Sequence, residues 1–322
     1  MLSVKIKLER EDFTLNVNFE VKQERVTVLF GKSASGKSTI MRCIAGLEKS
    51  HGEIALNGHV WQSTHEGMYL LTQKRNLGYV FQEARLYEHI SVAKNITLGL
   101  SANVIEKNPL LITLLKLEDL LERMPQQLSG GERRRVSIAR ALIRKPAVLL
   151  FDEPLAGIDQ VHRKSMLQYI QKVTRGLKVP VLYVTHHVDE VVAIADEILL
   201  IDNGRVTDQS EFASFVLSSS KAVELGVEGS CITIESLDSF DNGDYYISAK
   251  HVLVAEKDSK VAGKMVLEGK IVSVSHLSNT VKSVVVKTDL GAVRAYAYTA
   301  YNGFDAEVGK ECTLAITELV KR

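Results

Sequence analysis

This sequence is poor in the features that most readily narrow a function. Three of its 322 residues are cysteines and none forms a C-x-x-C pair, so we expect reduced, mostly buried thiols in a reducing compartment. The 40 basic and 39 acidic residues leave a net charge of +1 without a long basic tract, which gives little case for a nucleic-acid partner. No apolar run approaches the roughly 18 residues of a membrane helix, and the charged residues 1–10 do not resemble a signal peptide. A cytosolic chain is therefore predicted.

What the chain does contain is a glycine-rich turn after an apolar, β-branched run. Gly31 and Gly36 give this turn its backbone freedom, and successive N–H groups of such a turn can cradle the β-phosphate of a nucleotide. Lys37 can reach the β- and γ-phosphate oxygens, and the Ser38 hydroxyl can ligate Mg²⁺. An accidental Gly/Ser loop is the alternative. The residues predicted to hold ATP here are Gly31, Lys32, Ser33, Ala34, Ser35, Gly36, Lys37, Ser38 and Thr39.

A second apolar run, residues 147–151, ends in the acidic pair Asp152 and Glu153. A buried strand that ends in two acids suits the carboxyl edge of a parallel sheet, where nucleotides bind. Asp152 would hold Mg²⁺, directly or through water, and Glu153 would be the general base or the anchor for the water that attacks the γ-phosphate. Alone, such a pair is more often a solvated turn. Beside a phosphate loop, the catalytic interpretation is favoured.

Between these motifs, residues 128–132 (L-S-G-G-E) open an amphipathic helix. The N-terminus of this helix offers free N–H groups and the positive end of a helix dipole to an anion. By itself, Ser129 before two glycines is usually an N-cap and a turn. The five residues match the signature of the ATP-binding cassette family, and Arg135 falls where that family keeps an arginine. The chain therefore resembles this family.

The resemblance covers roughly the first 210 residues, in which further family elements follow in order. Gln82 matches the glutamine that senses Mg²⁺ and the attacking water, and His186 matches the histidine that contacts the γ-phosphate. Asp159 matches an aspartate that crosses to the opposite protomer. The implied fold is α/β, a P-loop cassette with a mostly parallel sheet and a helical subdomain at about residues 85–135. Phe13 is the candidate to stack on adenine, and the alternative is a strand residue that faces the core.

The resemblance also implies a mechanism. Two protomers face each other head to tail, so that each ATP lies between Lys37 and Ser38 of one chain and the signature of the other. ATP closes the dimer and hydrolysis opens it, so one chain alone should be a poor ATPase. The residues expected to act in trans are Ser129, Gly130, Gly131, Glu132 and Asp159.

A polar break at residues 218–220 and a change of composition after it predict two domains. Residues 1–220 would form the cassette, residues 221–255 a linker with a short β segment, and residues 256–322 a small β-barrel domain. From the strand pattern alone, such a domain either binds a ligand or holds two chains together.

Residues 78–89 narrow the resemblance to molybdate importers, because they are similar to the segment G-Y-V-F-Q-D-A-R-L-F-P-H of those ATPases. The tail looks like the mop-type oxyanion-binding domain that these ATPases carry. We therefore predict the ATPase of a molybdate importer at the cytoplasmic face of the inner membrane, working with a permease dimer and, by family analogy, an external substrate-binding protein. Alternatives are another cargo (tungstate, sulfate, ferric iron, a polyamine or a sugar) and a soluble cassette without a permease.

The sequence departs from the family at several positions. Ala34 replaces a loop glycine, which is tolerable if its φ angle is negative. Glu88 stands where the family has proline, and His187 where an aspartate is common. In the tail, residues 262–265 replace the motif Ser-Ala-Arg-Asn and keep one cation, Lys264. Oxyanion binding by the C-terminal domain is therefore a separate hypothesis.

Overall fold

The computed structural model describes residues 1–156, 158, 160–176, 178–218, 229–234, 243–249, 252–256, 263, 265–276, 281–298, 306–316 and 320–321. The chain divides into two compact units, residues 1–190 with 194–209, and residues 191–193 with 210–322. Each unit has its own buried apolar core. Of the linker predicted at residues 221–255, the stretches 221–228, 235–242 and 250–251 lie outside the described residues.

The first unit is built on a sheet whose described strands follow the order β6-β5-β4-β1-β2-β11-β10-β3-β9-β8-β7. One half of this sheet is parallel, and every residue of its β3, β8 and β9 is buried. Strands covered on both faces require near-continuous apolar runs, which is what these segments contain. Their carboxyl ends gather at one edge of the sheet. The parallel strands are β7 (Leu77–Val80), β8 (Val148–Asp152), β3 (Val26–Phe30), β9 (Val181–Thr185) and β10 (Glu197–Asp202).

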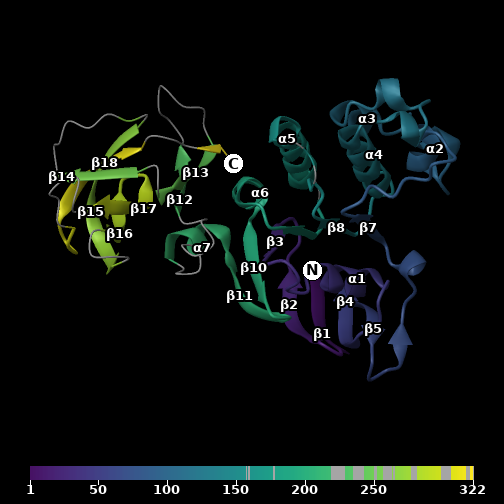
Figure 1. Cartoon of the computed structure of the whole chain (residues 1–322), viewed down its shortest axis with the longest axis horizontal. Helices are drawn as coiled ribbons and strands as arrows, with labels where there is room; N and C mark the ends of the chain where they lie inside the picture. The colour runs from purple at the N-terminus through teal and green to yellow at the C-terminus, as the bar shows by residue number, and fades with distance from the viewer. Residues whose placement is uncertain are drawn as a thin grey trace. The chain divides into compact units, whose positions relative to one another are not determined.

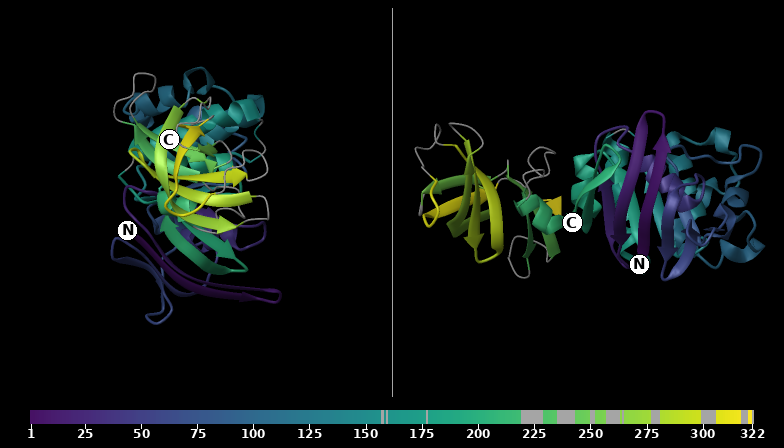
Figure 2. Two further views of the ribbon diagram at one scale, coloured as in Figure 1. Left: turned by 90° about the vertical axis from the view of Figure 1, so that its left-hand side faces the viewer. Right: turned by 90° about the horizontal axis from the view of Figure 1, so that it is seen from below.

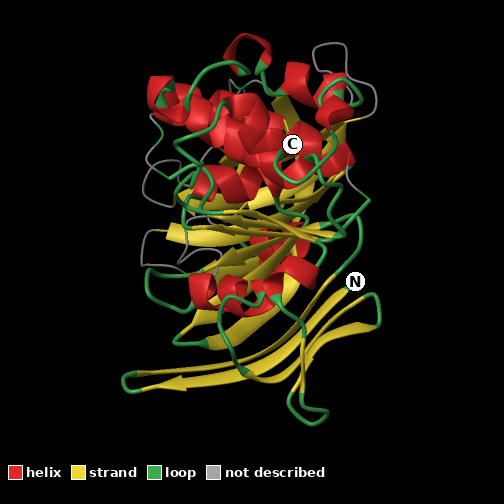
Figure 3. Cartoon of the chain, turned by 90° about the vertical axis from the view of Figure 1, so that its right-hand side faces the viewer, coloured by secondary structure: helices red, strands yellow, loops and turns green. Residues whose placement is uncertain are grey.

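The other half of the sheet is mainly antiparallel. Here β1 (Leu2–Arg10) pairs with both β2 (Phe13–Val21) and β4 (His51–Leu56), and the β1–β2 pair forms long, twisted ribbons beside the label N in Figure 3. Buried and exposed residues alternate along β2, as expected for a strand with one face on the core. The sheet is completed by β5 (His59–Ser63), β6 (Met68–Tyr69) and β11 (Arg205–Glu211).

A helical lobe lies between β7 and β8 in the sequence, where α2 and α3 accompany α4 (Figure 1). Its leucine-rich stretch forms short segments instead of one long helix: Leu115, Leu117 and Leu120 are buried, whereas Leu110 is 85% exposed. The lobe contains α2 (Val92–Thr97), η2 (Ala102–Val104), α3 (Pro109–Leu114), η3 (Glu118–Leu120), η4 (Pro125–Gln127) and α4 (Gly130–Leu142). The other helices of this part of the chain are α1 (Lys37–Ala45), η1 (Thr72–Lys74), α5 (Gln160–Gly176) and α6 (Val188–Ile194).

The second unit contains a closed barrel of strand order β14-β17-β16-β15-β18, coloured green to yellow in Figure 2. Its core is formed by aliphatic side chains such as Val254, Ile271, Val284 and Leu314. The barrel strands are β14 (Val252–Glu256), β15 (Met265–His276), β16 (Val281–Thr288), β17 (Gly291–Tyr298) and β18 (Glu311–Ile316). Alongside it are α7 (Phe212–Ser218) and a small sheet of β12 (Gly229–Ile234), β13 (Gly243–Ser248) and β19 (Val320–Lys321).

The predicted fold class is confirmed, because an α/β cassette is followed by a small β barrel. Among the residues that the structure describes, no helix is both long enough and apolar enough to cross a membrane.

A buried guanidinium, that of Arg75, holds the end of α1 in place. Its Nη1 donates to the carbonyls of Cys43 (2.9 Å) and Ile44 (2.7 Å), and its Nε donates to Leu70 (2.9 Å). The carbonyls at a helix C-terminus carry partial negative charge and lack intrahelical partners, so a cation there satisfies both needs. The same group lies 5.7 Å from the centre of the Trp61 ring. The helix that follows the phosphate loop is thereby anchored at its far end.

We expect Arg75→Met to lower the free energy of unfolding of the first unit by about 3 kcal/mol, because buried carbonyls lose a charged donor. Urea unfolding followed by fluorescence measures this, since Trp61 is the one tryptophan of the chain. Lys49→Met is the matched control: its ammonium lies 5.4 Å from the centre of the Tyr69 ring but is exposed, so the change should stay within about 0.5 kcal/mol. Equal losses in both variants would contradict the anchoring role.

Candidate active site

The predicted phosphate loop is the turn between β3 and α1, and both of its glycines are required by close contacts. A Cβ on Gly31 would lie 2.2 Å from the carbonyl oxygen of Ile201. Gly36 has a φ of +104°, and a Cβ there would lie 2.7 Å from Cζ of Phe13. The structure thus brings Phe13, the adenine candidate, against the phosphate loop. Lys32, Ser33, Ala34 and Ser35 complete the turn, and Ser38 and Thr39 lie in the first turn of α1.

Lys37 directs its amine into the turn. The Nζ donates to the carbonyl oxygens of Gly31 (2.9 Å) and Lys32 (2.7 Å). Burial lowers the pKa of Lys37, while the nearby carboxylates of Glu153 and Asp152 oppose that shift. A partly desolvated ammonium held by backbone carbonyls can exchange those partners for phosphate oxygens without moving far.

Both carboxylate oxygens of Asp152 accept hydrogen bonds. Ser38 donates its hydroxyl to Oδ1 (3.0 Å) and Tyr79 donates its hydroxyl to Oδ2 (3.0 Å). Burial raises the pKa of Asp152, and these two hydrogen bonds oppose the shift. A carboxylate and a serine hydroxyl are the oxygen ligands that Mg²⁺ uses beside nucleotide phosphates. The described residues form no cluster of three or more His, Cys, Asp and Glu side chains for a metal, so Mg²⁺ here would depend on phosphate oxygens to complete its coordination.

Glu153 receives side chains from two other strand ends. Its Oε2 accepts from Nε2 of Gln82 (3.3 Å), and its Oε1 lies 3.2 Å from Nδ1 of His186. The backbone N–H of Glu153 donates to the carbonyl of Val184 (3.0 Å), and its φ is +46°. Such a left-handed conformation is uncommon outside glycine and recurs at active sites. Three predicted catalytic residues, distant in sequence, therefore meet around one carboxylate.

The helix signature has the expected cap. The Ser129 hydroxyl accepts from the N–H of Glu132 (3.3 Å), and the Glu132 carboxylate accepts from the N–H of Ser129 (2.7 Å). That backbone N–H lowers the pKa of Glu132. A Cβ placed on Gly130 or Gly131 would meet nothing within 4 Å, so the surface at this helix end is open to a partner. Asp159, the other residue predicted to act in trans, lies outside the described residues.

Two site neighbours were missed by the sequence analysis. Tyr79, the partner of Asp152, lies within the segment used for family comparison but had no role assigned. Arg134 is buried and donates to the carbonyls of Phe81 (2.7 Å) and Ala156 (3.4 Å), so α4 is tied to the residues that precede Gln82 and follow Glu153. Arg135, the residue that matches the family pattern, is a different member of this run of three arginines, and no local spacing shows that Arg134 is buried.

The condition under which Ala34 would be tolerated without strain is not met, because its φ is +62°. The Cβ of an L-residue in this left-handed region crowds the following carbonyl, at a cost of roughly 1–2 kcal/mol. At Ala34 the loop therefore keeps a backbone conformation that suits glycine, although the residue there carries a methyl side chain.

Ala34→Gly should raise the free energy of unfolding by about 0.5–1 kcal/mol, since the relief of strain exceeds the added entropy of the unfolded chain. Denaturant unfolding measures the change. Ser33→Gly is the control, because Ser33 is a neighbour in the same loop that is not among the residues of positive φ, so its substitution should be neutral or destabilising. A gain with Ser33→Gly, or a loss with Ala34→Gly, would contradict the assignment of strain.

His187, at a position where the family commonly has aspartate, contacts the predicted catalytic histidine. The ring centres of His186 and His187 lie 4.1 Å apart. Burial, followed by the charges of Arg163 and His186, lowers the pKa of His187. A neutral ring at position 187 can lie against His186 without charge repulsion.

This shift makes stability depend on pH with a definite sign. Below pH 6.5 the unfolded chain protonates His187 before the folded chain does, so the unfolded state binds more protons and stability falls as the pH falls. His187→Phe should flatten that acid-side fall in the free energy of unfolding, measured by denaturant titration at several pH values. His65→Phe, at an exposed turn, should leave the slope unchanged. The same slope in wild type and His187→Phe would contradict the effect.

Described residues of this unit also line two hollows, one of which shares Tyr79 with the site. A groove of about 410 Å³ is lined by Tyr79, Phe81 and Tyr87 together with Arg85, Arg140 and Arg144. The Arg85 guanidinium lies 4.7 Å from the Phe81 ring centre, and that of Arg140 lies 5.7 Å from the Tyr87 ring centre.

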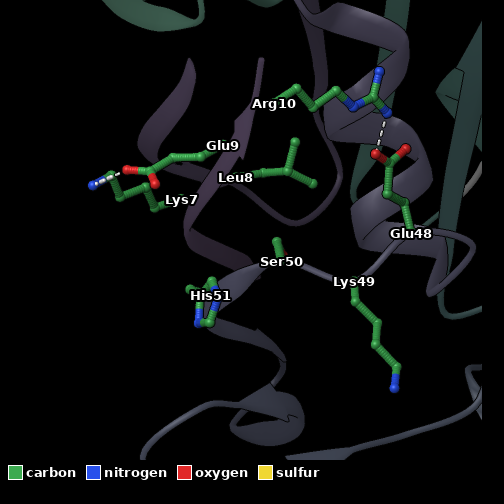
Figure 4. Close-up of a pocket in the computed structure, with 8 residues that line it drawn as sticks. All are labelled: Lys7, Leu8, Glu9, Arg10, Glu48, Lys49, Ser50 and His51. Carbon is green, nitrogen blue, oxygen red and sulfur yellow. Dashed lines mark hydrogen bonds and ion pairs between the residues drawn. The ribbon is translucent and has the colours of Figure 1, made fainter. Parts of the chain in front are cut away.

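The other hollow, of about 550 Å³, is shown in Figure 4. Its charged groups are largely paired with each other, Lys7 with Glu9 (2.6 Å) and Arg10 with Glu48. None of the residues predicted to bind or hydrolyse a nucleotide lines it. It borders the β1–β2 hairpin, where Arg10 pairs with Phe13. Although larger, it is therefore not the candidate active site.

Comparison with known proteins agrees with this geometry. The sequence profile of the ABC transporter family matches residues 14–156. The molybdenum import ATP-binding protein ModC of Pseudomonas aeruginosa is 45% identical over 60% of this chain and 55% of the relative, so the aligned part spans about half of that protein. ModC of Pseudomonas fluorescens is 37% identical over 84% of this chain and 76% of the relative. A dimeric ATP-binding cassette in a post-hydrolysis state with ADP and Pi superimposes with a TM-score of 0.56 at 25% identity, covering 66% of this chain and 98% of that one.

Taken with the fold, these matches show that the chain belongs to the ABC transporter family, whose cassettes bind ATP. Within that family, the curated relatives reported above are molybdenum import ATP-binding proteins.

Proposed function

We propose that this chain is the ATP-hydrolysing subunit of an ABC importer, and that two copies close around two ATP molecules to drive uptake of an oxyanion, molybdate first. The observation that carries the proposal is the meeting of strand ends around Asp152 and Glu153. Ser38 lies within hydrogen-bond distance of the Asp152 carboxylate, and Gln82 and His186 lie within that distance of the Glu153 carboxylate. Phosphoryl transfer needs chiefly positioning and charge stabilisation, and this cluster supplies both.

Each side chain then has a distinct task. Lys37 contacts the β- and γ-phosphates, and Ser38, Asp152 and Gln82 would hold Mg²⁺, which neutralises phosphate charge when bound. Glu153 accepts the proton of the attacking water while Gln82 and His186 orient its two oxygens. His186 also contacts the γ-phosphate. Phe13, placed against Gly36, stacks on the adenine.

The second copy would complete the site. The open end of α4 supports this, since its first N–H groups and dipole favour a γ-phosphate presented by another chain. Ser129, Gly130, Gly131 and Glu132 would act there together with Asp159. A solved cassette of the same fold is described as dimeric and bound to ADP and Pi, which agrees with this arrangement.

The groove lined by aromatic rings and arginines is suited to bind a short helix of the permease. Apolar rings flanked by cations fit a short helix with an apolar face and polar or acidic ends. Asn95 keeps the groove in shape, because its side chain accepts from the N–H of Tyr87 (2.8 Å) and donates to the carbonyls of Tyr87 (3.0 Å) and Ile90 (3.0 Å). Docking there would hold the chain peripherally at the cytoplasmic face of the inner membrane. An external substrate-binding protein would deliver the cargo.

The cargo is proposed from the relatives, whose names specify molybdenum import. Tungstate, sulfate, ferric iron and polyamines are the alternatives. Oxyanion binding by the barrel stays a prediction, because Ala262 and Lys264 of the altered motif lie outside the described residues.

Glu153→Gln should trap a dimer with ATP bound, because the amide keeps the shape of the carboxylate but cannot take the proton of water. Size-exclusion chromatography with light scattering in ATP and Mg²⁺ measures the state, and phosphate release should fall by on the order of 100-fold or more. Adding Lys37→Ala to this variant should restore the monomer. If Glu153→Gln stays monomeric with bound ATP, the closing mechanism is refuted.

Cells that depend on this chain and its permease should lose molybdate uptake on the order of tenfold or more with Lys37→Ala, because the phosphates lose their cation. Uptake of labelled molybdate, with unlabelled tungstate, sulfate and ferric iron as competitors, measures both activity and cargo. Lys49→Ala, an exposed lysine outside the site, should retain uptake. Loss of another cargo with unchanged molybdate uptake would reassign the importer.

A further inference from the structure

Tyr79 belongs to both the active site and the groove. Its hydroxyl donates to Oδ2 of Asp152 (3.0 Å), and Tyr79 is among the residues that line the groove, with its ring centre 4.0 Å from that of Phe81. The ring and its hydroxyl form one rigid group, so a movement of the ring moves the hydroxyl as well.

The strand pairing explains how one side chain reaches both places. The strands β7 and β8 are parallel neighbours, and Tyr79 pairs with Leu150 in their register. Side chains two residues apart share a face of the sheet, so Leu150 and Asp152 point to the same side. The long tyrosine side chain therefore extends along that face to the carboxylate two residues beyond its own partner. Phe81, directly after the last residue of β7, lines the groove.

The other oxygen of Asp152 is occupied as well. Ser38 donates to Oδ1 (3.0 Å), and the opposing hydrogen bond from Tyr79 fixes the carboxylate plane between two hydroxyl groups. Residues that hydrogen-bond to metal ligands set the orientation of those ligands, and their loss typically costs tenfold or more in metal affinity. A displacement of the Tyr79 ring would move its hydroxyl and so turn Asp152.

We infer that Tyr79 is a positioning residue that couples occupancy of the groove to the orientation of the Mg²⁺ carboxylate Asp152. The inference rests on the proposed function, in which the groove receives a permease helix and Asp152 holds Mg²⁺. Binding in the groove then changes metal affinity, and by thermodynamic reciprocity Mg²⁺ with nucleotide changes the groove.

Tyr79→Phe tests the metal half, because it removes the hydroxyl and keeps the ring. Binding of a fluorescent ATP analogue is titrated at increasing Mg²⁺, without reliance on hydrolysis. The Mg²⁺ concentration for half-maximal binding should rise on the order of tenfold, while nucleotide affinity without Mg²⁺ stays unchanged. Tyr69→Phe is the matched control, since that hydroxyl donates to the carbonyl of Gly46 (2.9 Å), and it should match wild type.

The groove half is tested with a fluorophore sensitive to its surroundings, attached to Leu98→Cys. Leu98 lines the groove and is 43% exposed, whereas Cys43 and Cys312 are buried. The third cysteine, Cys231, is replaced by serine in every labelled variant. ATP with Mg²⁺ should change the emission of this label, and adding Tyr79→Phe should remove at least half of the Mg²⁺-dependent change. The same label on Leu110→Cys, 85% exposed and outside the groove lining, should show no such dependence.

The outcomes separate this inference from the proposed function. If the wild-type chain binds no ATP, the proposed function fails and takes the inference with it. If wild type binds ATP with Mg²⁺ but Tyr79→Phe shows the same Mg²⁺ requirement or the same emission change, the coupling through Tyr79 is refuted and the ATPase assignment stands.

Discussion

Parallel pairing of β3, β7, β8 and β9 is the constraint on which every functional contact in this chain depends. It places the ends of strands that are far apart in sequence at one edge of the sheet. The phosphate loop follows β3, Gln82 follows β7, the acidic pair closes β8, and His186 follows β9. Hydrogen bonds among these side chains are possible only because strand spacing sets their backbones about 5 Å apart.

Three buried cations of this unit and the buried Asp152 are held by neutral polar groups. Lys37 and Arg134 donate to backbone carbonyls, as Arg75 does at the end of α1. Asp152 instead accepts from two hydroxyl groups. Such partners offset part of the cost of burial while leaving the charge available to a ligand, since a carbonyl or hydroxyl is more easily exchanged for phosphate or metal than a salt-bridge partner is.

The arrangement also sets the groove and the nucleotide site close together. Tyr79 of β7 is one of the residues that line the groove. Gln82, two residues after the end of the same strand, contacts Glu153. Arg134 holds the carbonyl of Phe81 from α4, the helix whose N-terminus bears the signature. A partner in the groove would therefore touch elements that bear on Asp152, on Glu153 and on the surface offered to a second copy.

The sequence by itself determined the phosphate loop, the acidic pair, the helix cap and the order of α/β and β units, because each depends on neighbours within a few residues: glycine freedom, apolar runs, Ser129 with Glu132. It also identified Gln82 and His186, but only through a family pattern, since nothing in the neighbouring sequence distinguishes a catalytic polar residue after a strand from an ordinary one. The tertiary structure alone decided the positive φ of Ala34, the burial of Arg134 and Arg75, and the tilted ring contact of His187 with His186. It also decided that Tyr79 reaches Asp152. These features depend on strand register and helix packing between residues as many as 73 positions apart, as for Tyr79 and Asp152, and no local spacing in the chain carries that information.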